Sequence, residues 1–204
     1  MNINGVITAA GLSTRMGDFK PLMMLEGKTL IENCIDSMLD AGVTCVTVVL
    51  GYRADEIEAL LSSRYNDDHL VLAYNTEYAS TDMLTSVKIG IRSLPACDAF
   101  FLLPGDMPAV SASTFRALQK AWAQTRPMVV FPTMAGKRKH PPLISYECIR
   151  DILSYEGDNG LRGIWRRFEE QTVLVTVDDD GCLIDADTME DYERLTEYMK
   201  EKNI

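Results

Sequence analysis

Apolar stretches of two kinds alternate along the chain. Short runs rich in β-branched and aromatic residues, such as 43–50 and 99–103, are typical of strands buried on both faces. Between such runs, apolar residues recur every three or four positions, which is the spacing of an amphipathic helix. The predicted strands cover 4–8, 43–50, 70–74, 99–103, 128–131, 143–144 and 173–177. The predicted helices cover 29–40, 55–62, 84–94, 111–124, 146–153, 161–169 and 188–200.

Regular alternation of strands and helices predicts an α/β fold, with a mostly parallel central sheet covered by helices. Ligands of such sheets bind beside the carboxyl ends of the strands. No internal repeat, linker or low-complexity tract divides the 204 residues, and a hydrophobic content of 47% is enough for one core. We therefore expect a single domain over residues 1–204.

The charge balance is acidic, with 30 carboxylates against 20 Lys and Arg and a formal net charge of −10. This balance argues against general nucleic-acid binding, which requires a basic face. A single nucleotide remains compatible with it, because a few local cations meet its charge. The 5 cysteines form no C-x-x-C pair, which indicates buried free thiols in a reducing compartment. The N-terminus enters a strand directly, without a signal peptide or membrane span, so we expect a cytoplasmic protein.

The segment from Thr8 to Leu22 carries the strongest chemical signal. It reads T-A-A-G-L-S-T-R-M-G-D-F-K-P-L and follows a short apolar run. Glycine lets backbone approach a ligand closely, and successive backbone N–H groups form an anion-binding concavity. Arg15 and Lys20 add cations suited to phosphate oxygens. The glycine spacing fits neither a Walker A loop nor a dinucleotide fingerprint, so the segment predicts a different triphosphate-binding loop.

Two acidic motifs predict a metal site. Asp106, in L-L-P-G-D-M-P, follows a buried strand and therefore lies at the carboxyl edge of the sheet. Asp185 and Asp187 stand two residues apart, so their side chains point the same way in an extended segment. Mg²⁺ is held by one or two carboxylates together with substrate phosphates. The alternative role of Asp106 is to cap a turn. The alternative for the second motif is that Asp187 or Thr188 caps the last helix. The neighbouring run 178–181, D-D-D-G, predicts a solvated hairpin turn.

These motifs together resemble the MobA-like nucleotidyltransferases. The loop matches A-A-G-x-S-x-R-M-G-x-x-K-x-L, the G-D-M-P string matches the metal motif of the family, and I-D-A-D-T-M-E-D-Y matches part of its D-I-D-T-P-E-D string. Within the family, the chain most resembles the molybdenum cofactor cytidylyltransferases. The resemblance implies a three-layer, Rossmann-like (GT-A-type) fold and a reaction that depends on Mg²⁺ or Mn²⁺.

The resemblance also implies roles for individual residues. The implied catalytic residues are Lys20, Arg15 and Asp106. The implied nucleotide-binding residues are Ala9, Ala10, Gly11, Leu12, Ser13, Arg15, Lys20, Asn75, Ser86, Pro104 and Gly105. The implied metal ligands are Asp106, Asp187 and Asp185, with Asp187 preferred as the second ligand. The implied acceptor-binding residues are Lys139, His140, Pro141, Asp158 and Arg162.

Four positions depart from the family pattern. Asp82 replaces a glycine between Asn75 and Ser86, and Lys139 replaces the second glycine of G-x-x-G-H-P. Ala186 replaces an isoleucine and Met189 replaces a proline. The hydroxyls near residue 86 suit an anionic group or a base edge at a helix N-terminus, or serve only as caps. The basic run 137–139 suits an anionic acceptor, or is only a solvated loop.

The reaction implied by the resemblance moves CMP from CTP to the phosphate of molybdopterin and releases pyrophosphate. Such chemistry depends on positioning and charge neutralisation, and no Ser–His or Cys–His pair is needed. The A-A-G form resembles the pyrimidine-using members. Guanylyl transfer, or transfer to a sugar phosphate or phospho-alcohol, remains open. A non-catalytic nucleotide-binding regulatory module is the alternative of another class, and the intact Lys20 and Asp106 argue against it. A molybdoenzyme or its maturation factor is a further expected partner, although no segment identifies a docking surface.

Overall fold

A computed structural model describes residues 1–12 and 19–202. The strands are β1 (Ile3–Ala9), β2 (Met24–Leu25), β3 (Lys28–Thr29), β4 (Val46–Leu50), β5 (Leu70–Tyr74), β6 (Ala99–Pro104), β7 (Val129–Met134), β8 (Lys137–Arg138), β9 (Leu143–Ser145) and β10 (Thr172–Thr176). The α-helices are α1 (Leu30–Asp40), α2 (Ala54–Arg64), α3 (Met83–Arg92), α4 (Ala112–Thr125), α5 (Ile149–Ser154), α6 (Gly160–Trp165) and α7 (Met189–Lys202). Short 3-10 helices are η1 (Lys20–Leu22), η2 (Tyr146–Cys148), η3 (Arg166–Gln171) and η4 (Asp180–Leu183).

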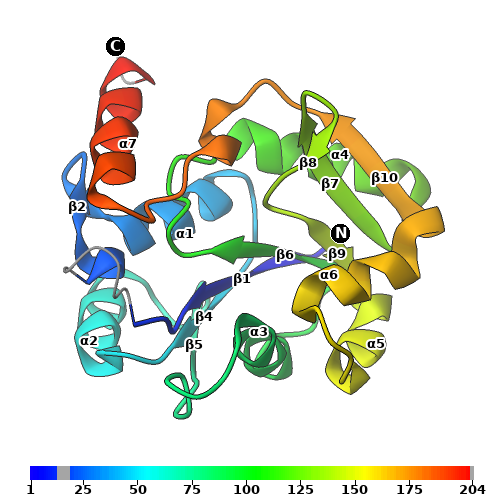
Figure 1. Ribbon diagram of the computed structural model, residues 1–204, viewed down its shortest axis with the longest axis horizontal. Coiled ribbons are helices and arrows are strands. Elements are labelled where there is room, and N and C mark those ends of the chain that lie inside the picture. The colour runs from blue at the N-terminus through cyan, green and yellow to red at the C-terminus, as the bar shows by residue number, and fades with distance from the viewer. Residues whose placement is uncertain (13–18, 203–204) are drawn as a thin grey trace.

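The central sheet has the strand order β10-β7-β9-β6-β1-β4-β5, and β8 pairs with β7 outside this path (Figure 1). Strand β1 lies between β6 and β4 and is parallel to both, with Gly5 opposite Phe101 on one side and Val46 on the other. Strand β5 continues the parallel half, whereas β9 is antiparallel to β6 and β7. The predicted α/β fold with a mostly parallel sheet is confirmed.

Helices cover both faces of the sheet, because successive strand residues point to opposite sides. Ile7 and Phe101 belong to a buried cluster with residues of α1, α2 and α4. Val6 and Phe100 belong to a second buried cluster with residues of α3, α5 and α6. Figure 1 shows α1 and α4 on one side of the sheet, with α3 and α5 on the other. The molecule therefore has the three layers that the resemblance implies.

Helix α3 lies unusually close to the sheet. A Cβ atom at Gly90 would stand 2.6 Å from Val6 and 2.8 Å from Val49, so only glycine fits between the helix and β1 and β4. This close approach sets the height of α3 over the sheet. The N-terminus of the helix consequently lies near the carboxyl ends of the strands, where the candidate site is found.

Several sequence predictions differ from the structure. The helix predicted over 146–153 is divided into the 3-10 helix η2 and the α-helix α5. The helix predicted over 161–169 is divided into α6 and the 3-10 helix η3, which keeps Phe168 in the same apolar cluster as Ile164. The solvated turn predicted over 178–181 is wrong at Asp179, which is 4% exposed. Its carboxylate accepts hydrogen bonds from the side chains of Ser111 and Thr114, so partners on α4 hold it inside.

Two further sequence expectations can be compared with the described part of the chain. The 5 cysteines are free, and all except the half-buried Cys97 are buried. No helix within residues 1–12 and 19–202 is long and apolar enough to cross a membrane.

Candidate active site

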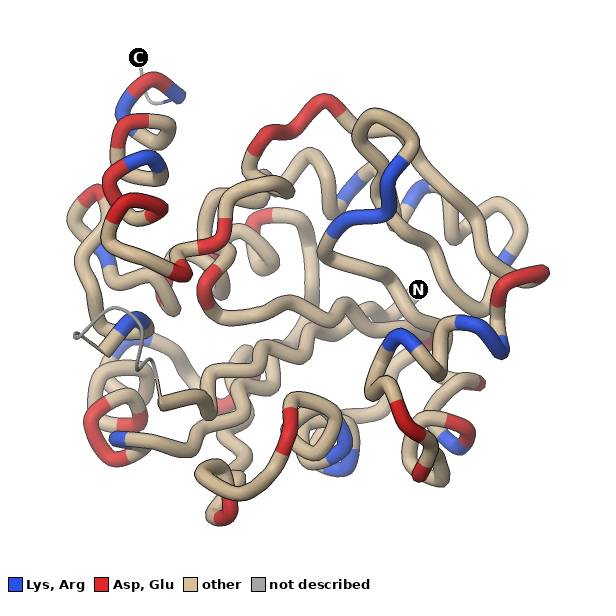
Figure 2. The backbone as a smooth tube through the Cα atoms, in the orientation of Figure 1, with Lys and Arg blue, Asp and Glu red and all other residues tan. Residues whose placement is uncertain are grey.

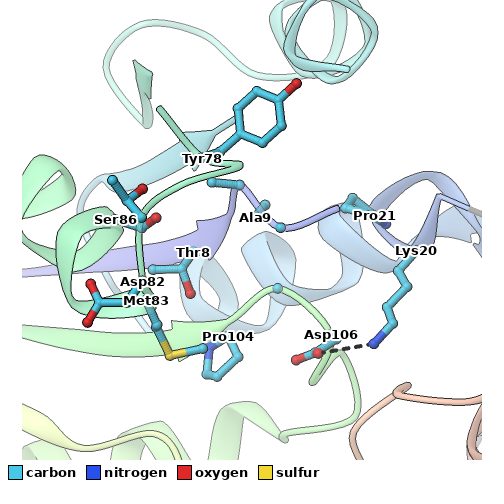
Figure 3. A pocket seen from close by; sticks show the side chains of 14 residues that line it. Thr8, Ala9, Lys20, Pro21, Tyr78, Asp82, Met83, Ser86, Pro104 and Asp106 are labelled. Carbon is cyan, nitrogen blue, oxygen red and sulfur yellow. Dashed lines mark ion pairs between the residues drawn. The ribbon is translucent and has the colours of Figure 1, made fainter. Parts of the chain in front are cut away.

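A pocket of about 240 Å³ lies at the carboxyl ends of β1 and β6, at the sheet edge that the sequence predicts. Figure 3 shows side chains from the segments after both strands turned toward it. The pocket is lined by Thr8, Ala9, Ala10, Gly11, Lys20, Pro21, Tyr78, Thr81, Asp82, Met83, Ser86, Pro104, Gly105 and Asp106. Eight of these were predicted site residues, and they come from three separate parts of the chain, at 9–20, 86 and 104–106.

The turn after β6 fixes the backbone around Asp106 from two directions. The Gly105 amide donates to the Thr8 carbonyl at 3.0 Å, which ties the turn to β1. A Cβ atom at Gly105 would approach that carbonyl to 3.2 Å, so the close contact favours glycine. The Asp106 carbonyl accepts from the Ala186 amide at 2.9 Å. This last bond brings the segment of Asp185 and Asp187 to the pocket.

Lys20 lies between two carboxylates. Its Nζ stands 2.7 Å from Asp187 Oδ1 and 3.6 Å from Asp106 Oδ2, and the residue is 9% exposed. Thr188 forms the cap of the last helix by exchanging hydrogen bonds with Asp191. The alternative that Asp187 caps this helix is therefore wrong, and its carboxylate instead faces the ammonium group.

The surroundings of Asp106 shift the pKa of its carboxyl group. Burial raises the pKa of Asp106 above its ordinary value, and the nearby carboxylates of Asp187 and Asp185 raise it further, while Lys20 lowers it. Within the described residues, no three His, Cys, Asp or Glu side chains are grouped closely enough to hold a metal ion by themselves. Mg²⁺ does not need three, because it keeps waters and takes phosphate oxygens beside one or two carboxylates. Asp106 and Asp187 fit this kind of oxygen donor set.

The opposite wall of the pocket is formed by the start of α3. Asp82 caps this helix by accepting from the Thr85 amide at 3.0 Å, which accounts for an aspartate at the family's glycine position. Ser86 lines the pocket, whereas Asn75 is 3% exposed and lies behind it. Asn75 Nδ2 donates to Ser86 Oγ at 3.1 Å. Asn75 therefore contacts Ser86 in the wall of the pocket, and its contact with the nucleotide stays a prediction.

The five predicted acceptor residues do not line this pocket in the described structure. His140 is half-buried, and burial lowers its pKa, which favours the neutral imidazole. Asp158 and Arg162 are exposed, and α6 follows Asn159, so Asp158 is not the helix cap. Figure 2 shows Lys and Arg along β8, on the half of the molecule formed by β7 and β10.

Several nucleotide-loop predictions have different outcomes. Ser13 and Arg15 lie outside the described residues. Leu12 is 42% exposed and does not line the pocket. Thr8, Thr81 and Met83 line it although they were not predicted as site residues. Thr8 ends the apolar run before the loop, and the other two lie between Asn75 and Ser86, which were both predicted to bind nucleotide. Closeness in sequence to predicted site residues could therefore have identified all three.

Residues that follow β1 and a carboxylate that follows β6 meet at one edge of the sheet in a three-layer molecule, and this arrangement is typical of a nucleotidyltransferase. Residues 5–173 match the model of the MobA-like NTP transferase domain, and the chain belongs to this family. It is 30% identical to the molybdenum cofactor cytidylyltransferase of Escherichia coli, over 96% of this chain and 98% of that protein.

Solved structures have the same fold as this chain. A nucleotidyl transferase from Methanothermobacter thermautotroptrophicus superposes with a TM-score of 0.82 at 26% identity, over 98% of this chain and 99% of that one. A Mycobacterium tuberculosis protein, Rv0371c, solved in complex with manganese, has the same fold with a TM-score of 0.73 at 22% identity, over 97% of this chain and 98% of that one.

Proposed function

We propose that this nucleotidyltransferase transfers CMP from CTP to the phosphate of molybdopterin cofactor and releases pyrophosphate. The observation that carries the proposal is Lys20 placed between Asp106 and Asp187, beside the A-A-G loop in one pocket. The choice of CTP and molybdopterin is supported by similarity to the Escherichia coli cytidylyltransferase over nearly the full length of both chains.

In the proposed reaction, an acceptor phosphate oxygen attacks the α-phosphorus of CTP in line. The bond from the α-phosphorus to its bridging oxygen breaks, and pyrophosphate leaves with that electron pair. The attacking phosphate is already ionised at neutral pH, so no general base is required. The work of the protein is to position the two substrates and to stabilise the charge of the transition state.

Lys20 supplies a positive charge at this position from a buried side chain. Asp106 and Asp187 would hold Mg²⁺ or Mn²⁺, with Asp185 adjacent, and the bound ion would neutralise triphosphate charge. The backbone bonds of the turn at Asp106 keep its carboxylate at the pocket while nucleotide binds. Arg15, in the same loop as Lys20, is proposed as a further phosphate contact.

The acceptor is proposed to approach from the half of the molecule that carries Lys139, His140, Pro141, Asp158 and Arg162. Lys139 and Arg162 provide positive charge suited to an anionic acceptor. A neutral His140, which its lowered pKa favours, suits positioning of the acceptor by hydrogen bonds.

The proposal is tested by measuring pyrophosphate release with molybdopterin cofactor and each of CTP, GTP, ATP and UTP. We expect release with CTP and Mg²⁺ only when the acceptor is present, and a CMP–molybdopterin product by mass spectrometry. If GTP is the only one of the four nucleotides that gives release, the substrate is GTP and the assignment of CTP is wrong. No release with any nucleotide would contradict the proposed reaction.

A further inference from the structure

The wall of the pocket at the start of α3 contains a closed hydrogen-bond network around Asn75. In Figure 3, Ser86 and Asp82 lie at one end of the pocket, and Lys20 and Asp106 lie at the other. If phosphates and metal lie with the charged pair, the nucleoside of a bound nucleotide extends toward Ser86. The direction of each hydrogen bond in this wall therefore decides whether the pocket presents a donor or an acceptor to the nucleoside.

The Asn75 amide has one orientation. The Glu77 backbone N–H lies 3.1 Å from Asn75 Oδ1, and a backbone N–H only donates. The oxygen of the amide must therefore face Glu77, and Nδ2 must face the two hydroxyls of the network. Nδ2 stands 2.9 Å from Thr81 Oγ1 and 3.1 Å from Ser86 Oγ.

The same reasoning fixes the two hydroxyl groups. Nδ2 of an amide only donates, so both hydroxyl oxygens accept from it. Thr81 directs its own hydrogen to the Glu77 carbonyl at 2.9 Å. Ser86 has no acceptor for its hydrogen among residues 1–12 and 19–202. Since the residue is 6% exposed and lines the pocket, that hydrogen is left to point into the pocket.

We infer that Asn75 is a positioning residue that turns the Ser86 hydroxyl into a hydrogen-bond donor for the nucleoside part of the substrate. Its partner is an acceptor atom there, either a base carbonyl, a ring nitrogen or a ribose oxygen. The inference rests on the proposed function, because it requires a nucleotide in this pocket. It assigns Ser86 to substrate contact and Asn75 to control of that contact.

The test is calorimetric binding of CTP with Mg²⁺ and no acceptor, so that no turnover is needed. S86A removes the donor and should weaken CTP binding about 10-fold. N75D is nearly isosteric, but its carboxylate accepts the Ser86 hydrogen and turns it away from the pocket, so we expect a similar loss. The double variant N75D/S86A should bind within about twofold of S86A, because both changes remove one contact. S80A, an exposed serine in the same loop, is the matched control and should bind as the wild type does.

Inorganic tripolyphosphate with Mg²⁺ separates the inference from a general loss of structure. We expect S86A and N75D to bind this probe as tightly as the wild type, because it has no nucleoside. Equal weakening of CTP and tripolyphosphate, or unchanged CTP binding in S86A, would overturn the inference alone. If N75D does not fold, S86A with the two probes still decides. Failure of the wild type to bind any nucleotide would overturn the proposed function and the inference with it.

Discussion

Two aspartates of this protein, the buried Asp179 and the half-buried Asp106, have opposite electrostatic surroundings. Asp179 accepts hydrogen bonds from the Ser111 amide, the Ser111 hydroxyl and Thr114, and Lys202 Nζ stands 3.1 Å away. Burial disfavours its charge, but these donors outweigh burial and lower its pKa. Asp106 has one ammonium group at 3.6 Å and carboxylate neighbours, and its pKa is raised.

The comparison distinguishes Asp179, whose carboxylate stabilises the fold, from Asp106, whose carboxylate is proposed to bind a cation. The native contacts of Asp179 satisfy it and join α4, η4 and α7. Among the described residues, the carboxylates of Asp185 and Asp187 lie near Asp106 as well as Lys20, and a bound cation would offset their negative charge. Perturbed carboxylates in clefts are candidate functional groups for this reason. The predictions below test whether the two residues divide stability and function in this way.

The largest expected effect is on activity. D106N should lower kcat/KM by about 100-fold or more, because it removes a charge that holds the cation and substrate in the transition state. Its thermal unfolding midpoint should equal or exceed that of the wild type, since the ionised carboxylate is penalised by burial. Steady-state kinetics and calorimetry measure the two effects. A variant that unfolds early but keeps its activity would reverse the comparison.

The largest expected effect on stability comes from the other aspartate. D179N should lower the free energy of unfolding by about 2–3 kcal/mol, because buried donors lose their charged acceptor. Urea unfolding of D179N beside D178N gives the measurement, because Asp178 is exposed and adjacent and should tolerate the same change. Folded D179N should keep kcat/KM within about twofold of the wild type. Equal free energies of unfolding for D179N and D178N would contradict a stabilising role for Asp179.

The pH dependence of stability should have opposite signs at the two sites. The folded-state pKa of Asp179 is lowered, so its stabilisation is full above the unfolded value of about 3.9 and is lost as pH falls through the folded value. The folded-state pKa of Asp106 is raised, so its ionisation costs stability at neutral pH and this cost disappears as pH falls through the folded value. Urea unfolding from pH 7 to pH 3 should show the wild type losing more stability than D179N. D106N should show its advantage over wild type only at the higher pH.

A smaller effect is expected at the start of α7. T188A removes the cap that Thr188 forms with Asp191 and should cost about 1 kcal/mol of stability. Because this cap leaves Asp187 facing Lys20, the variant should also weaken Mg²⁺-dependent CTP binding by about twofold to threefold. Urea unfolding and calorimetry measure the two effects. E190A, an exposed change in the same turn, is the control and should alter neither quantity.

The sequence alone predicted the sheet, the helices over it and the two central charged residues. Asp106 closely follows a short apolar run, and Lys20 lies in the loop after the run at Val6 and Ile7, so the position of each at the carboxyl edge depends on local pattern and fold class. The proximity of Asp187 depended on a motif match, because no local pattern places a segment near residue 187 beside β6.

Other features depend on tertiary contacts that no local pattern carries. Asp179 belongs to a run that resembles a solvated turn, and only its partners on α4 and α7 make it a buried acceptor. Asn75 was predicted to contact the nucleotide, and in the structure its amide group contacts Glu77, Thr81 and Ser86. In both cases the type of residue was informative, whereas its partner had to come from the packed structure.

The most direct test of the central claim is a calorimetric titration of CTP into wild type and D106N, with Mg²⁺ and with a chelator. Our account predicts tight binding by the wild type only with Mg²⁺, loss of that Mg²⁺ dependence in D106N, and its retention in D179N. Equal CTP affinity with and without Mg²⁺ in the wild type, or an unchanged Mg²⁺ dependence in D106N, would contradict the assignment of Asp106 to a cation site.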